Sequence, residues 1–297
     1  MSQSQPDKPH LDIDQFQVEV RREILLNAYE IGYGFPDEWK KFAERNLSFV
    51  RAFPELMEFS WDVFKSKRKH KISKPHELIA FSHLSLAQED FQQILCLAVN
   101  AHGGAAQARV RTMFERVVLA AYFIKFPDQA EPYMYFELVE RRKRLYRARD
   151  LYSGRKGEAL RKVLNQRIEE LSVGIEQLKL KFGKTFTSKW TDAGFDVLSK
   201  AVGLQNHYLY SYLVPNAFVH ASPSDLAHRI VEEEQFYVEQ GPDSINSDEA
   251  VKSAHVLLVF SFEVADQLLK LRRKSAVHKL CRECVRIHRS KLSRLII

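Results

Sequence analysis

Hydrophobic residues recur every three or four positions along most of this chain, which is the period of amphipathic helices. The longest apolar stretch with this period is 103–125, GGAAQARVRTMFERVVLAAYFIK, and it carries Arg111, Glu115 and Arg116 near its middle. A charged side chain inside a buried helix costs free energy unless it has a partner. We therefore expect this helix to form one wall of a polar cluster.

The same period predicts nine further helical stretches, so the predicted fold class is all-α, a multi-helix bundle with long antiparallel helices. These stretches are 12–31, 36–65 with a break or kink at Pro54, 73–100, 132–151, 158–182, 195–202, 205–219, 248–271 with a cap near Ser247, and 275–296. Alternation between 227 and 241 predicts at most one short hairpin. We divide the chain into a helical N-terminal extension (1–74), a main helical domain (75–270) and a basic C-terminal helix (271–297).

Composition places the chain in the ordinary soluble class: 297 residues, 45% hydrophobic and 28% charged. No apolar run approaches the roughly 18 to 20 residues of a membrane-spanning helix, and the first residues lack the features of a secretory signal. The three cysteines, Cys96, Cys281 and Cys284, are too few and too unevenly spaced for a disulfide framework. These observations predict a cytoplasmic protein with no transmembrane segment.

The net charge of +7 is unevenly distributed. Residues 141–167 and 270–294 each carry +9, so the remainder carries −11. Such basic segments are candidates for binding nucleic acid or an acidic protein surface, and the alternative is that they are simply solvated helix faces. The candidate binding residues are Arg141, Arg142, Arg144, Arg147, Arg272, Arg273, Arg282 and Arg286.

A second stretch, 206–222, NHYLYSYLVPNAFVHAS, is aromatic and nearly uncharged, and every fourth residue in it is polar or aromatic: Tyr208, Tyr212, Asn216 and His220. Residues four apart share a helix face, and so do Arg111 and Glu115. If the two helices pack together, these six side chains converge. An arginine, a carboxylate and an imidazole could bind a phosphate and move a proton. The alternative is a buried polar network that only supports the fold.

The two stretches just described, with a tryptophan between them, resemble a widespread bacterial all-helical family of unknown function. The resemblance covers roughly 80–225 and rests on an R-x-x-x-E helix, a tryptophan, and an aromatic helix ending in Val-His: Arg111, Glu115, Trp190, Tyr208, Tyr212 and His220. This chain has Asn216 where the family usually has a serine. The resemblance implies a fold and no established activity.

Two further patterns are weaker. His278, Cys281, Cys284 and His288 resemble a zinc set, but on one continuous helix the outer two lie about 15 Å apart, too far for one ion. We therefore predict no metal and no cofactor. Arg282 and His288 have the R-x(4–6)-H spacing of HEPN-type helical ribonucleases. A chain of this composition is expected to contain such pairs by chance, so we treat the similarity as remote.

Two functional hypotheses follow. The first is an interaction module with a buried Arg/Glu/His cluster and two basic helices that dock an acidic partner or nucleic acid. The second is a metal-independent ribonuclease-like effector of a bacterial defence system, such as phage defence, or of a toxin system. In the second hypothesis His220 is the acid/base and Arg111 contacts the phosphate. Glu115 orients these groups, and Tyr208 or Asn216 assists the reaction. The narrow apolar seam of 158–182 also suggests a homodimer.

Overall fold

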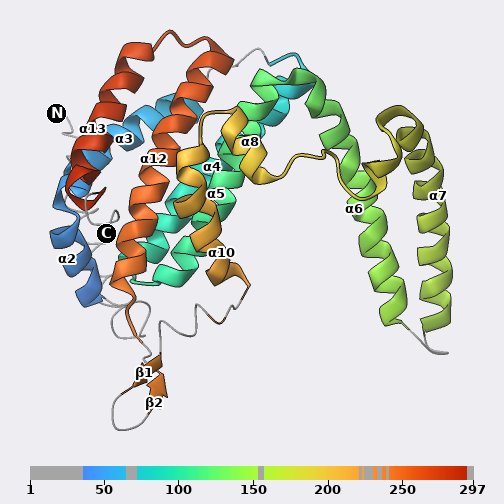
Figure 1. Cartoon of the computed structure of the whole chain (residues 1–297), viewed down its shortest axis with the longest axis horizontal. Helices are drawn as coiled ribbons and strands as arrows, with labels where there is room; N and C mark the ends of the chain where they lie inside the picture. The colour runs from blue at the N-terminus through green and yellow to red at the C-terminus, as the bar shows by residue number, and fades with distance from the viewer. Residues whose placement is uncertain are drawn as a thin grey trace, which may run out of the picture.

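The computed structural model describes residues 36–64, 72–152, 157–220, 223, 230–232, 236–238 and 241–292. The helix predicted at 12–31 lies outside this part of the chain. The predicted all-α class is confirmed, with helices packed into a bundle (Figure 1). The helices are α2 (Pro36–Arg45), α3 (Leu47–Phe64), α4 (Pro75–Val99), α5 (Gly103–Lys125), α6 (Ala130–Leu151), α7 (Glu158–Phe182), α8 (Phe195–Ala201), α9 (Gln205–Tyr208), α10 (Val214–Val219), α12 (Ser244–Leu269) and α13 (Lys274–Leu292).

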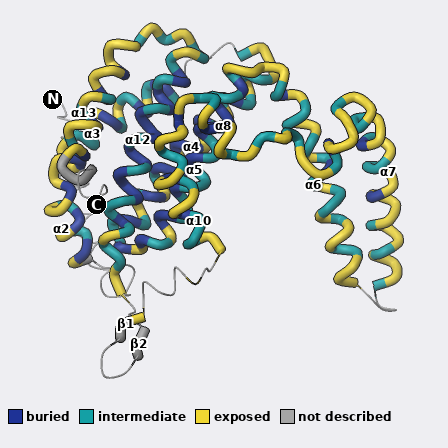
Figure 2. Tube along the Cα trace, in the orientation of Figure 1, coloured by how far each residue is buried: buried dark blue, intermediate teal, exposed yellow. Residues whose placement is uncertain are grey.

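The centre of the bundle consists of α4, α5 and α12, whose facing sides are almost completely buried (Figure 2). Phe91 of α4, Val110 and Phe114 of α5, and Leu257 of α12 each expose 0% of their surface. Fully burying a side chain of this size contributes about 1.5–3 kcal/mol, so this interface supplies much of the driving force for folding.

The start of α12 differs from the sequence prediction. We expected a helix beginning near 248 and capped by Ser247, but α12 begins at Ser244 because the Asp243 carboxylate accepts a hydrogen bond from the backbone N–H of Asn246 at 3.1 Å. This end packs tightly against the start of α5, where a Cβ on Gly103 would lie 2.5 Å from the Asp243 carbonyl oxygen. Glycine at 103 therefore permits the close approach of α5 and α12.

The outer helices α2, α3 and α13 cover the bundle on the side of α12 (Figure 1). Pro54 lies inside α3, so the helix does not break there, and of the two predicted alternatives a kink remains. One core cluster includes Phe49 and Leu56 of α3, the central helices, and Val277 and Leu280 of α13. Hydrophobic contacts therefore cross both proposed domain boundaries, at 74 and at 271. The division into an extension, a main domain and a C-terminal helix remains a prediction.

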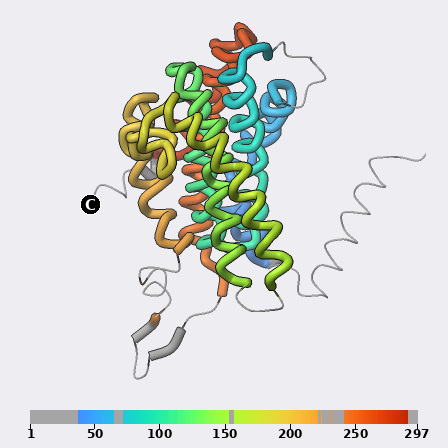
Figure 3. Tube along the Cα trace, turned by 90° about the vertical axis from the view of Figure 1, so that its right-hand side faces the viewer, coloured from blue at the N-terminus to red at the C-terminus, as the bar shows by residue number. Residues whose placement is uncertain are grey.

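A long antiparallel hairpin of α6 and α7 extends along one side of the bundle (Figures 1 and 3). Its own small core consists of Val139, Ile175 and Phe186, the last from a short 3-10 turn at Lys184–Thr187. Because most of the remaining surface of both helices is exposed (Figure 2), the hairpin presents two long solvated faces.

The segment 205–219 is divided into α9, a π-helical turn at Leu209–Leu213, and α10. Pro215 has no backbone N–H and its ring crowds the carbonyl of residue 211, so a regular α-helix through this position would lose a hydrogen bond and be strained. A wider turn just before the proline removes this conflict. The helix thus keeps its direction, and the residues on either side of the turn still face α5.

The predicted hairpin near 227–241 contains one antiparallel strand pair, β1 (Ile230–Glu232) and β2 (Phe236–Val238), with Val231 opposite Tyr237. In the described part of the chain, every helix is too short or too polar to cross a lipid bilayer.

Candidate functional site

The structure brings the Arg111 side chain of α5 into contact with three residues of the segment 205–220. Arg111 Nη1 donates to Asn216 Oδ1 and lies 3.2 Å from His220 Nε2, and Nη2 lies 3.4 Å from the Tyr212 hydroxyl. On its own helix, Arg111 Nε pairs with Glu115 Oε1 at 3.1 Å. Five of the six predicted cluster residues are therefore in direct contact, and we call them the Arg111 cluster: Arg111, Glu115, Tyr212, Asn216 and His220.

Every nitrogen of the Arg111 guanidinium has a partner within the protein. A guanidinium has donors and no acceptor, so in a hydrogen bond with Arg111 the His220 Nε2 must be unprotonated and accept. The ring can then carry its proton only on Nδ1. In that tautomer the Nε2 lone pair is occupied by the hydrogen bond from Arg111.

Aromatic rings support the cluster from one side. The sixth predicted residue, Tyr208, stacks on Tyr212 with ring centroids 5.0 Å apart, and Phe114 packs against both rings. Arg111 Cζ lies 4.8 Å from the centroid of the Tyr212 ring, which is a cation–π contact. Tyr208 thus contributes by stacking on Tyr212, and the hydrogen bonds of Arg111 go to other residues. Burial raises the pKa of the Tyr208 hydroxyl, so this group stays protonated at neutral pH.

The cluster lies at the surface of the bundle and is only partly covered. The Arg111 side chain is 19% exposed, that of Glu115 is 30% exposed, and His220 is exposed. Burial raises the pKa of Glu115, while the neighbouring Arg111 opposes this shift. The sequence hypothesis of a buried network therefore describes the arginine well and the histidine poorly, because the imidazole can be reached from solvent.

A second charged cluster on α5 was not predicted from the sequence. Arg116 Nε lies 2.7 Å from Asp90 Oδ2 and Arg109 Nη1 lies 3.4 Å from Asp90 Oδ1, and the Asp90 side chain of α4 is only 2% exposed. Burial raises the pKa of Asp90 to about 6 against the effect of both arginines. Two arginines of the apolar helix thus form ion pairs with a buried carboxylate and compensate its charge in part, and this use of charge is structural.

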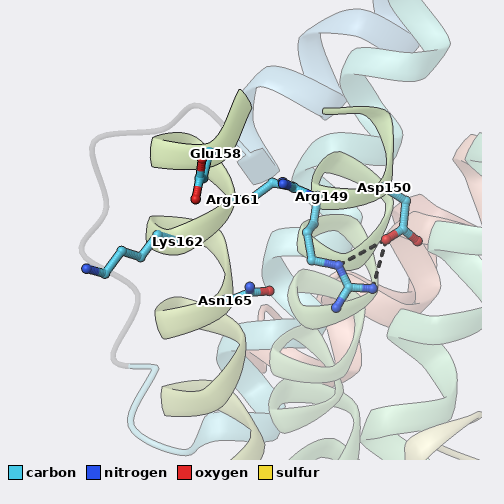
Figure 4. A pocket seen from close by; sticks show the side chains of 6 residues that line it. All are labelled: Arg149, Asp150, Glu158, Arg161, Lys162 and Asn165. Carbon is cyan, nitrogen blue, oxygen red and sulfur yellow. Dashed lines mark hydrogen bonds and ion pairs between the residues drawn. The ribbon is translucent and has the colours of Figure 1, made fainter. Parts of the chain in front are cut away.

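The predicted cations of α6 lie on the α6–α7 hairpin, and several already have partners. Arg144 pairs with Glu137 at 2.8 Å and Arg142 Nη1 lies 3.4 Å from Ser172 Oγ. Arg141 and Arg147 are exposed and form no hydrogen bond or ion pair with another described residue. A pocket opens between the ends of α6 and α7 (Figure 4), and it is lined by Arg149, Asp150, Glu158, Arg161, Lys162 and Asn165. In this pocket Arg149 is held by Asp150 at 2.8 Å.

The predicted cations near α13 are divided between paired and unpaired positions. Arg273, which directly precedes the helix, pairs with Asp62 of α3, and Arg286 of α13 pairs with Glu283 of the same helix. Arg272, which also precedes the helix, and Arg282 are exposed, and neither forms an ion pair with another described residue. Part of the positive charge in this region therefore meets acidic residues of the same chain.

Three other sequence candidates lie apart from the Arg111 cluster. Trp190 contacts the rings of Phe123 and Tyr133 at 5.8 and 5.1 Å, about 18 Å along α5 from Arg111 at 1.5 Å per residue. Arg282 is exposed whereas His288 is 4% exposed, so this pair does not form one site. His278 is likewise exposed, and at 100° per residue it lies about 80° around α13 from the buried His288.

The fold and the site define an all-α bundle protein with a surface arginine cluster between α5 and α10. Residues 77–237, more than half of the chain, match a family of unknown function, DUF5677. The chain belongs to that family, and the matched region includes the whole Arg111 cluster. No curated protein and no solved structure matched the chain.

Proposed function

We propose that this protein is a helical interaction module whose α6–α7 hairpin docks an acidic partner protein. The observation that supports the proposal is an exposed stripe along α6. Met134, Glu137, Arg141, Arg144, Ala148 and Leu151 recur at the three- and four-residue spacing of one helix face, and all of them are exposed except Ala148, which is half-buried. We call this set the α6 stripe.

The α6 stripe points away from α7. Val139, which is 0% exposed, packs with Ile175 of α7, and at 100° per residue the stripe lies on the opposite side of α6. Each end of the stripe carries a large apolar side chain: Met134 is 50% exposed and Leu151 is 81% exposed. An available face with two central arginines and apolar ends fits a protein surface that has acidic groups between apolar patches.

A protein partner is favoured over nucleic acid because of these apolar ends. Phosphate backbones are contacted mainly by cations and polar groups, and exposed aliphatic side chains gain little from them. In addition, Arg144 is paired with Glu137, so the stripe is not a continuous row of free cations.

The proposal is tested by photo-crosslinking from Ala148, which lies within the α6 stripe. With benzoylphenylalanine at this position, irradiation of the native cells should give one protein adduct, identified by mass spectrometry as an acidic protein. Arg141→Glu/Arg144→Glu should reduce the adduct at least about tenfold, since like charges at an interface cost several kcal/mol. Binding of the purified partner should weaken as salt increases.

Lys162→Glu/Arg167→Glu is the matched control, because it makes the same change in net charge at two exposed cations of α7. This variant should keep the adduct. Equal loss of the adduct in both double variants would mean that only net charge matters, which contradicts a specific α6 stripe. An adduct that ribonuclease removes would show that the partner is nucleic acid and not a protein. The absence of any adduct would contradict the proposal.

In this interaction module the Arg111 cluster fixes the position of α10 on α5. One specific observation favours the second candidate function, a metal-independent ribonuclease-like effector: the exposed His220 presents its Nε2 3.2 Å from a guanidinium. An imidazole base beside a fixed positive charge is an arrangement that can deprotonate a hydroxyl and stabilise the phosphate transition state. Against it, each Arg111 nitrogen already has an internal partner, so a phosphate would have to displace one.

RNA cleavage and growth inhibition distinguish the two functions. For an interaction module, wild type, His220→Ala and Arg111→Ala should show the same background cleavage when their circular dichroism spectra match. For a ribonuclease, removing the acid/base should reduce cleavage by a factor of about 10² or more. Wild-type cleavage that both substitutions abolish would replace the interaction module by the enzyme.

A further inference from the structure

Three metal-ligating side chains meet in the core where α12 packs against α13. His255 comes from α12, and Cys284 and His288 come from α13. His255 Nδ1 lies 3.1 Å from His288 Nε2, and the two ring nitrogens and the Cys284 sulfur all lie within 4.8 Å of one another. All three residues are buried, with exposures of 2% for His255 and 4% for each of the other two.

The amphipathic pattern of α13 explains why two of these ligands share one face. Val277, Leu280, Cys284 and His288 recur every three or four residues and are all buried, while the cations occupy the other side. The face turns towards α12, where His255 lies, and the edge of Phe49 from α3 covers the His255 ring at 5.3 Å between centroids. The ligands are therefore enclosed by three helices.

Two imidazoles are unusual occupants of such a site. A buried polar ring is costly unless its nitrogens have partners, and an aliphatic side chain would fill the same space without that cost. Neutral imidazole and thiolate are the ligands that Zn²⁺ prefers in proteins.

We propose that His255, Cys284 and His288 bind a Zn²⁺ ion that joins α12 to α13. In a tetrahedral zinc site the ligand atoms lie about 3.3 to 3.6 Å apart, given Zn–N and Zn–S bonds of about 2.0–2.1 and 2.3 Å. The observed N···N separation of 3.1 Å and the upper limit of 4.8 Å need only small side-chain movements to reach this geometry. The Cys284 thiol loses its proton to solvent on coordination, and a water molecule completes the four ligands.

The single-helix zinc set considered from the sequence is different from this site. α13 is continuous from Lys274 to Leu292, and His278 lies exposed on its outer side. Cys281 Sγ lies 3.3 Å from Glu263 Oε1, outside the three-residue group. The prediction of no metal considered ligands on one helix only, whereas the third ligand here comes from α12.

The experiment uses the full chain without a polyhistidine tag. Metal analysis of the purified protein should give one Zn²⁺ per chain, and Co²⁺ substitution should give a thiolate-to-cobalt charge-transfer band with visible d–d bands. Removing the metal should lower the melting temperature by about 5 °C or more, because zinc in hundredfold excess over its Kd stabilises the folded state.

Matched variants on the same helix locate the site. Cys284→Ser should abolish the charge-transfer band and His288→Gln should weaken Co²⁺ binding at least about tenfold, whereas Cys281→Ser and His278→Gln should leave both unchanged. A folded wild type without stoichiometric metal and without the cobalt band would overturn the proposal, and so would a band that persists in Cys284→Ser. If Cys284→Ser does not fold, the proposal is decided by the Zn²⁺ content of the wild-type protein and by the change in its melting temperature when the metal is removed. None of these measurements depends on the α6 stripe.

Discussion

Between pH 4 and pH 6 the wild-type protein should lose about 2 kcal/mol of unfolding free energy that the variant Asp90→Asn retains. This range covers most of a pKa shift of about two units, and each unit is worth about 1.4 kcal/mol. Asp90 is 2% exposed, and burial raises its pKa from 3.8 to about 6. A carboxyl whose pKa is higher in the folded state contributes stability below its unfolded pKa, and this contribution is lost as the pH rises through the folded pKa. The window is therefore 3.8 to about 6.

The physical cause is the incomplete compensation of a buried negative charge. Arg116 Nε is 2.7 Å from Asp90 Oδ2, yet among the described residues this oxygen has no aligned hydrogen-bond donor. The contact is an ion pair without good hydrogen-bond geometry, and Arg109 is further away and 39% exposed. Desolvation of the carboxylate thus exceeds the attraction of the two guanidiniums.

His83 has the opposite pH dependence and must be separated in the measurement. Burial lowers its pKa from 6.5 to about 4, so it contributes stability above pH 6.5 that is lost as the pH falls towards 4. Urea unfolding of wild type, Asp90→Asn and the exposed control Glu89→Gln at pH 4, 5, 6 and 7 gives differences from which the His83 contribution largely cancels. If the Asp90→Asn difference does not change between pH 4 and 6, the proposed charge burial is wrong.

The fold class could be predicted from the sequence because each helix carries its own period. Positions such as Val110, Phe114 and Val117 mark the buried side of α5 by spacing alone, and all three are 0% exposed. The cap of α12 could not be placed in the same way. Asp243 and Ser247 are both good N-capping residues. Which of them caps the start of α12 depends on the approach of Gly103 from α5.

The Arg111 cluster could be predicted because both of its halves are local patterns. Arg111 with Glu115, and Tyr212 with Asn216 and His220, each follow the four-residue spacing of one helix, so only one helix pairing had to be assumed. The partner of Arg116 lies on α4 and the third ligand of Cys284 and His288 lies on α12. Such pairs depend on the relative rotation of two helices, which a single sequence does not state.

The cations near α13 show the same limit. The sequence correctly identifies a basic helix, but it does not reveal that Arg273 reaches Asp62 of α3. An acidic surface within the same chain satisfies part of the charge that we had assigned to an external partner. The α6 stripe is different, because Arg141 is exposed and lies on a face directed away from α7.

Phe114→Ala should lower the unfolding free energy by about 3–5 kcal/mol, the range measured for removing a fully buried aromatic ring. Phe114 exposes 0% of its surface, and its ring centroid lies 6.3 Å from that of Tyr208 and 6.0 Å from that of Tyr212. The loss combines hydrophobic transfer with a cavity beneath the two tyrosines. Urea unfolding at pH 7 measures this loss of unfolding free energy. The control is Phe126→Ala, just after the end of α5, where the side chain is 37% exposed, and it should cost about 1 kcal/mol or less.

Phe114→Leu separates the cavity from the ring contacts, because it keeps most of the volume and should cost less than about 1.5 kcal/mol. Tyr212 carries the cation–π contact with Arg111, so a cavity beneath its ring should also loosen the Arg111 cluster. In a double-mutant cycle, Phe114→Ala and Arg111→Met should therefore be non-additive by about 0.5 kcal/mol or more. Full additivity would show that the aromatic rings do not position the arginine, and that its polar partners on α10 hold it without help from the core.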